Sequence, residues 1–98
     1  MNSNLPFFDT ADPRIVEVID YTENGSLGVL IKFANGLSLS IIEDNCVSDL
    51  MFELAIFDKA EQYAPQYFDN NDNVIDCLRG CSPVDVNYYI SKLSNHHE

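Results

Sequence analysis

The sequence predicts an α+β domain: a four-stranded antiparallel β-sheet, connected as a meander, with a C-terminal α-helix packed on one face. Three observations lead to this fold class. Apolar residues alternate with polar ones in segments between residues 14 and 57, Asn-Gly pairs interrupt these segments at 24–25 and 35–36, and sustained helical spacing follows residue 82. With 98 residues, 46% of them hydrophobic, the chain suits one core. We therefore divide it into an irregular N-terminal arm, 1–13, and a single domain, 14–98.

The second and third strands are expected to be joined by a three-residue loop. Their apolar faces, set by the alternation of side chains along a strand, consist of Leu27, Val29, Ile31 and Phe33 and of Leu37, Leu39 and Ile41. A two-residue turn would pair Phe33 with Ser38 and leave the core half polar. The loop 34–36 instead pairs Phe33 with Leu37 and places Gly36 at the left-handed position that such loops require.

The same reasoning predicts the first hairpin and the fourth strand. A three-residue loop at 23–25 pairs Tyr21 with Leu27 and Ile19 with Val29. A fourth strand is expected over 50–57, where one face carries Leu50, Phe52, Leu54 and Ile56. Its polar link to the third strand runs from residue 43 to residue 49.

The last third of the chain is predicted as a loop, a short helical turn and a helix. Residues 60–73 are loop-like, and 74–78 are expected to form the helical turn, closed by Gly80. Ser82 can cap the helix over 83–94, with a proline at the first helical position and Asp85 in the first turn. The core-facing residues at helical spacing are Val86, Tyr89, Ile90 and Leu93.

Both faces of the predicted sheet are apolar, and one helix can cover only one of them. The residues opposite the main apolar set are Val16, Val18, Leu30, Ile42, Met51 and Phe57. Either the arm with Phe7 and Phe8 or a second copy in a homodimer must cover this second face, and we favour the homodimer.

The charge of the chain limits its partners. The chain has sixteen Asp and Glu residues and five Lys and Arg residues, so its formal net charge is −11 and its sequence pI is about 4.2. Such a surface repels phosphate backbones and anionic lipids, so we expect no direct nucleic-acid binding and no membrane binding. The N-terminal residues lack the basic and long apolar regions of a signal peptide, and three irregularly spaced cysteines do not suit a secreted disulfide scaffold. We expect a cytoplasmic protein of the host cell.

No catalytic or metal-binding arrangement is recognisable in the sequence. Cys77 and Cys81 lie four residues apart, but a second close pair of ligands is missing and both histidines lie near the C-terminus. We expect Cys77 to be buried and Cys81 to be a partly exposed thiol. The run 69–73 opens like a calcium loop but lacks its required Gly and bidentate Glu. We expect no cofactor and no enzyme, and keep a small metal-dependent regulator or enzyme as an alternative.

Carboxylates recur in the predicted loops and strand ends, and these are the candidate partner-binding residues. Flat, amphipathic tyrosines beside such charges often act as interface anchors. The candidate site therefore consists of Glu43, Asp44, Asp49, Asp58, Glu61, Tyr63, Tyr67, Asp69, Asp72 and Asp76. Two alternatives stay open: the carboxylates only keep the surface solvated, or the tyrosines belong to the core, which we favour for Tyr89.

From Phe52 onward, the order FELAIFDK, an acidic loop, NVIDCLRG and SPVDVNYYISKL resembles short uncharacterised phage and prophage proteins. Those proteins carry a strand end of the form E-[LI]-A-[VI]-[LF]-D-K and a final helix that begins T-x-E-E-V-N. The chain departs from them at Val84-Asp85, which replaces the Glu pair, and in the inserted segment 63–68. The resemblance covers about half the chain and implies an accessory product of a mobile element, a group that includes anti-CRISPR and anti-restriction inhibitors.

Together these observations favour a non-enzymatic acidic inhibitor. The expected partner is a basic host protein or ribonucleoprotein complex of defence or nucleic-acid processing, whose nucleic-acid-binding surface the carboxylates would block. An immunity or antitoxin-like protein that neutralises a basic toxin is the alternative of the same physical kind.

Overall fold

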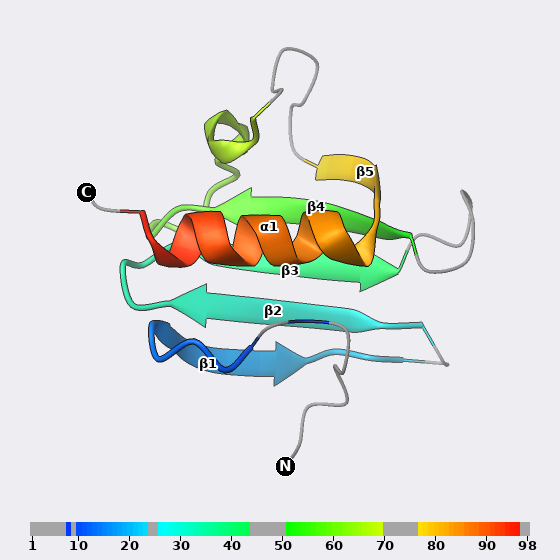
Figure 1. Cartoon of the computed structure of the whole chain (residues 1–98), viewed down its shortest axis with the longest axis horizontal. Helices are drawn as coiled ribbons and strands as arrows, with labels where there is room; N and C mark the ends of the chain where they lie inside the picture. Colours follow the sequence, from blue (N-terminus) through cyan, green and yellow to red (C-terminus); the bar gives the residue numbers. More distant parts are fainter. Residues whose placement is uncertain (1–7, 9, 24–25, 44–50, 70–76, 97–98) are drawn as a thin grey trace.

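The computed structural model describes residues 8, 10–23, 26–43, 51–69 and 77–96 (Figure 1). Five antiparallel strands form one sheet in sequence order. The elements are β1 (Ile15–Asp20), β2 (Gly28–Phe33), β3 (Ser38–Glu43), β4 (Phe52–Phe57), a 3-10 turn η1 (Pro65–Tyr67), β5 (Cys77–Cys81) and helix α1 (Pro83–Ser94). The α+β class, the meander and the C-terminal helix are confirmed, whereas the prediction of a four-stranded sheet is wrong by one strand.

The β2–β3 hairpin has the predicted three-residue loop and register. Ile31 pairs with Leu39, and the Phe33 N–H donates to the Leu37 carbonyl at 2.9 Å. Gly36 has a φ of +94°, which places it in the left-handed region that glycine tolerates best. The parity of the apolar residues was therefore sufficient to predict this register.

The β1–β2 hairpin differs from the prediction by one residue. Val18 pairs with Ile31, and a bridge between Glu23 and Ser26 leaves two residues in the loop rather than three. The prediction failed because a β-bulge after Ile15 changes the parity of β1. Ile15 and Val18, which a regular strand would turn to opposite faces, therefore both pack against the core.

A fifth strand, absent from the prediction, borders β4. The expected helical turn over 74–78 is wrong for Leu78, which is extended and pairs with Leu54; residues 74–76 lie outside the described chain. Gly80 takes a φ of +70° within this short strand. By pairing with β4, β5 satisfies backbone groups that an unprotected strand edge would leave open.

The region around β4 is partly as predicted. β4 begins at Phe52, and Leu50 lies outside the described residues. After the strand, Tyr63 forms a bridge with Phe57, and the loop then turns through η1. Phe68 follows η1 and is 1% exposed, so this loop contributes to the core instead of only connecting elements.

Helix α1 has the predicted bounds and lies over β3 and β4 (Figure 1). The Asp85 N–H donates to the Ser82 hydroxyl at 3.3 Å, and the Ser82 N–H donates to the Asp85 carboxylate at 3.0 Å. This reciprocal cap contributes about 1 kcal/mol to helix stability. The buried face contains all the predicted residues, Val86, Tyr89, Ile90 and Leu93. Beneath it lie the buried side chains of the sheet: Val29, Ile31, Phe33, Leu39, Ile41, Phe52, Leu54 and Ile56.

The N-terminal arm packs on the same face as the helix. Phe8 is buried, and its ring meets Phe52 edge-on with centroids 5.3 Å apart. Asp12 accepts bonds from the Arg14 side chain at 2.7 and 2.9 Å, and these bonds lower the pKa of Asp12 to about 2. The proposal that the arm covers the second face is therefore wrong for Phe8; Phe7 lies outside the described residues.

The β2–β3 loop also holds the C-terminal end of α1. The Asn35 amide nitrogen donates to the carbonyls of Leu93 at 2.8 Å and His96 at 3.0 Å. Its amide oxygen accepts from the Leu37 N–H at 3.0 Å. One side chain thus closes the loop and ties it to the C-terminal end of the helix.

Candidate functional site

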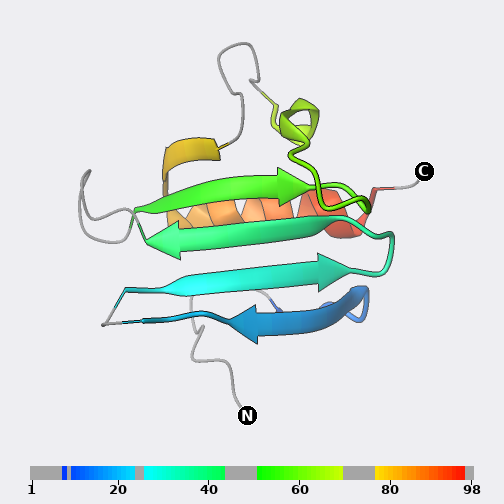
Figure 2. The ribbon, with the colours of Figure 1, turned by 180° about the vertical axis from the view of Figure 1, so that it is seen from behind.

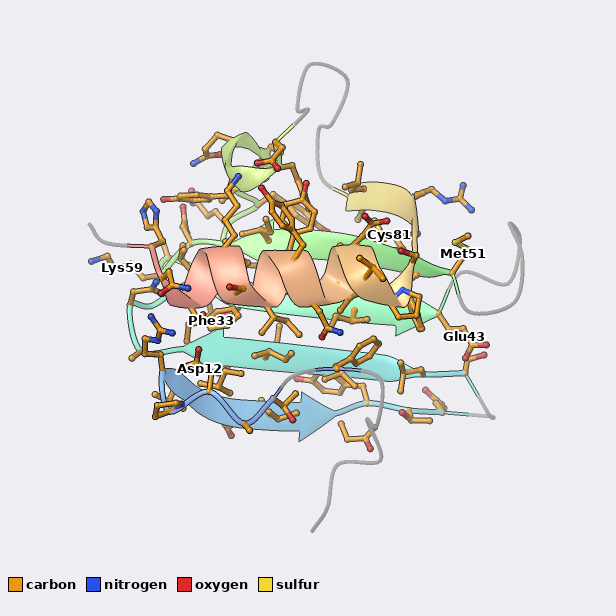
Figure 3. The ribbon with its side chains drawn as sticks, viewed as in Figure 1. Asp12, Phe33, Glu43, Met51, Lys59 and Cys81 are labelled. Atoms are coloured by element: carbon orange, nitrogen blue, oxygen red, sulfur yellow. The ribbon has the colours of Figure 1, made fainter. Side chains whose placement is uncertain are left out.

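The strand directions give the molecule two ends. Strands β1 and β3 end where α1 begins, and Glu43 lies there, so we call this the Glu43 end (Figure 3). Strands β2 and β4 end where α1 ends, and Lys59 marks this Lys59 end. The predicted site residues do not form one patch. Glu43 lies at the first end, and the other described members lie at the second: Asp58, Glu61, Tyr63, Tyr67 and Asp69. The remaining four, Asp44, Asp49, Asp72 and Asp76, lie outside the described residues.

At the Lys59 end, the Asp58 carboxylate organises the turn that follows β4. It accepts from the N–H groups of Ala60 at 2.9 Å and Gln62 at 3.1 Å. Glu61, at the tip of this turn, is exposed and has a φ of +61°. Tyr63 is 53% exposed and lies on the Phe57 ring, with centroids 4.9 Å apart. Of this group, Glu61 and Tyr63 are the exposed side chains.

The charge of Asp69 is compensated inside the chain. Its carboxylate accepts from the Lys92 ammonium and from the Tyr88 hydroxyl. The Lys92 bond, followed by the Tyr88 bond, lowers the pKa of Asp69, and the carboxylate in turn raises the pKa of Tyr88. Tyr67 meets the His96 ring edge-on at 4.9 Å. Asp69 and Tyr67 thus contribute to the contact between the η1 region and the α1 region.

Two carboxylates that the sequence analysis did not single out join Glu43 at its end. Asp20 and Glu23 are exposed on the β1–β2 hairpin. Asp20 accepts from the Thr22 N–H at 2.8 Å, which lowers its pKa, and Glu43 accepts from the Leu27 N–H at 3.1 Å. These donors are neutral backbone groups, so the hydrogen bonds bring no positive charge to the carboxylates. A meander places the β1–β2 loop beside the end of β3. The predicted topology could therefore already have indicated that the carboxylates of this hairpin lie near Glu43.

The cations are distributed unevenly. Four of the five, Arg14, Lys32, Lys59 and Lys92, lie at the Lys59 end. Ion pairs there join Arg14 to Asp12 at 2.7 Å, Lys32 to Glu17 at 3.9 Å and Lys92 to Asp69. At the Glu43 end the described part of the chain carries one cation, Arg79, which lies 3.8 Å from Glu53. The excess negative charge of the described residues is therefore concentrated at the Glu43 end.

A second surface stands out on the back of the sheet, which we call the open face (Figure 2). The helix and Phe8 lie on the opposite side, and in the described chain no helix or strand crosses the open face. Its large exposed side chains are Val16, Tyr21, Ile42 and Tyr63. Two shallow hollows of about 470 and 530 Å³ flank its centre, one beside Phe57 and one beside Ile42.

The cysteines have the reverse of their predicted exposure. Cys81 is buried, and this burial raises the pKa of its thiol to about 11, whereas Cys77 is half-buried. Among the described residues, no three His, Cys, Asp or Glu side chains are grouped to hold a metal ion. In the same part of the chain, no helix has the length and apolar character needed to span a bilayer.

Comparisons with protein-family models, curated proteins and solved structures found no match to this chain. The resemblance to phage accessory proteins thus remains a prediction from the sequence.

Proposed function

We propose that the chain is a non-enzymatic inhibitor that blocks a basic surface of a host defence or nucleic-acid-processing protein in the cytoplasm. The observation that carries this proposal is the uneven charge of the molecule: four of the five cations lie at the Lys59 end, and among the described residues no ion pair is formed by Asp20, Glu23 or Glu43. A positive partner surface would attract the Glu43 end over long range, which orients the encounter and raises the association rate.

The sequence around this end supports the same choice of surface. Asp44 and Asp49 lie in the sequence between Glu43 and Met51, and both of these flanking residues lie at the Glu43 end (Figure 3). The resemblance to phage accessory proteins supplies the biological class, in which inhibitors of CRISPR and restriction systems occur. In such a complex, the carboxylates would take the places of nucleic-acid phosphates on the basic surface.

Two double variants with equal net charge test which end is recognised. Glu23→Gln with Glu43→Gln removes two charges from the Glu43 end, and the amide oxygen introduced by the second substitution would still accept the Leu27 N–H. Glu17→Gln with Glu61→Gln removes two charges elsewhere and serves as the matched control. The partner is first captured at low salt from a bacterial lysate, purified, and titrated against each variant.

We expect the first variant to bind the partner about tenfold more weakly or worse and the control to change affinity by less than about twofold, because close charge pairs contribute far more than distant ones. Equal losses of affinity in both variants would show that the partner responds to the total charge of the chain and not to the Glu43 end, which would contradict the choice of surface. No loss in either would contradict the proposal.

A further inference from the structure

The open face has the composition of a contact surface rather than of a solvated sheet. Its side chains include Val16 at 63% exposure and Ile42 at 47%, with half-buried Leu30 between them in the strand order. Single exposed apolar residues are common, but monomers rarely expose a contiguous apolar patch of more than a few hundred Å². The hydrophobic effect therefore favours a partner on this face.

The charges on the open face point to the kind of partner. Glu17 pairs with Lys32 across β1 and β2 at 3.9 Å, and Glu53 pairs with Arg79 across β4 and β5 at 3.8 Å. Each pair has no net charge. β3 lies between the two pairs in the sheet, and the side chains that it places on this face, including Ser40, are uncharged. The carboxylates that line the two hollows, Glu23, Asp58 and Glu61, lie toward the ends of the strands. In a chain with a net charge of −11, a second, equally negative copy therefore meets little charge at the centre of this face.

We propose that two copies of the chain associate through their open faces in a symmetric homodimer, with β3 of one copy over β3 of the other. Since β3 is the middle strand of five, a two-fold axis along the strands places β1 and β2 of one copy opposite β5 and β4 of the second. Ser40, which pairs with Leu30 and Ala55 within the sheet, then lies next to the axis.

The size of the open face sets the affinity that we expect for the dimer. Five strands about 4.8 Å apart, four of them six residues long and β5 five, span roughly 24 by 20 Å. Two such faces would bury about 1,000 Å² in total, which is the low end for a specific interface. The dimer should therefore dissociate on dilution in the micromolar range. The Glu43 ends lie at the rim of this interface, so dimerisation does not depend on the proposed basic partner.

Sedimentation equilibrium of the full chain over a wide range of concentrations tests the dimer. We expect Ser40→Glu to weaken self-association by about tenfold or more, because two carboxylates would face each other across a dry interface. Val16→Glu should weaken it as well. The matched control is Val84→Glu, since Val84 is 77% exposed on the helix surface, away from the open face, and it should dimerise like the wild type.

A charge-swap pair separates a lost interface from a misfolded chain. Ser40→Lys alone should also be monomeric, whereas an equimolar mixture of Ser40→Lys and Ser40→Glu should regain the dimer. Dimerisation of the wild type should strengthen with added salt, because salt screens the repulsion between two negative chains, whereas binding to a basic partner should weaken. A wild-type chain that is monomeric at all concentrations, or a mixture that does not regain the dimer, would overturn the inference.

Discussion

Removal of the Asn35 side chain should separate the β2–β3 loop from the end of the helix. Asn35→Ala deletes three hydrogen bonds: two to the carbonyls of Leu93 and His96 and one from the Leu37 N–H. Each hydrogen bond of this kind contributes about 1 kcal/mol. Because the bonds are only partly buried, we expect the free energy of unfolding to fall by about 2 kcal/mol, a large share of the roughly 5–15 kcal/mol of a typical domain.

Urea denaturation followed by circular dichroism measures this loss, and Asn35→Asp serves as the comparison. The aspartate can still accept from the Leu37 N–H, but it cannot donate to the helix carbonyls and adds a negative charge at the negative end of the helix dipole. We expect it to destabilise the chain at least as much as the alanine. If Asn35→Asp were as stable as the wild type, the two bonds to the helix would contribute nothing and the reasoning would fail.

Three further changes probe other parts of the fold. Gly36→Ala should lower stability by about 2 kcal/mol in thermal melts, because the new Cβ would lie 2.9 Å from the Lys59 Cβ at a φ of +94°; an unchanged melting temperature would contradict this. The pKa of Asp12 is about 2 in the folded chain, below its ordinary value of 3.8, so the stability that Asp12 contributes is complete above pH about 5 and is lost as the pH falls toward 2. The stability difference between wild type and Asp12→Asn should shrink over that range; a constant difference would disprove the role of the charge. Cys81, with its pKa raised to about 11, should react with iodoacetamide far more slowly in the folded than in the urea-unfolded chain, as measured by peptide mass spectrometry. Similar rates in both states would show that the thiol is accessible.

Local sequence signals were sufficient where they were strong and mutually consistent. Ser82, Pro83 and Asp85 mark the start of α1, and the helical spacing of apolar residues marks its buried face. In the β2–β3 hairpin, the parity of the apolar residues and the position of Gly36 agree on one register. These elements depend on near neighbours in the chain, so the sequence predicts them well.

The features that the sequence did not predict depend on irregular or distant contacts. The bulge after Ile15 shifts the β1–β2 register by one residue without any glycine or proline to signal it. The short strand β5 contains Arg79 and Gly80 and has no clear alternation, so its identity comes from the exposed edge of β4.

The candidate site was predicted in part for a similar reason. The acidic composition identified the kind of surface, but the position of each charge relative to the cations requires the strand directions. Asp69 has the same residue type as the exposed Asp20, yet its charge is compensated by Lys92, twenty-three positions further along the chain. Spacing in the sequence contains no information about such a contact.

Salt dependence of partner binding tests most directly whether the negative charge of the Glu43 end is recognised. The affinity of the wild-type chain for its purified partner would be measured by calorimetry from about 50 to about 500 mM NaCl. We expect the affinity to fall steeply and continuously as the salt concentration rises, with a shallower fall for the Glu23→Gln, Glu43→Gln variant. An affinity that stays the same across this range would contradict recognition through charge.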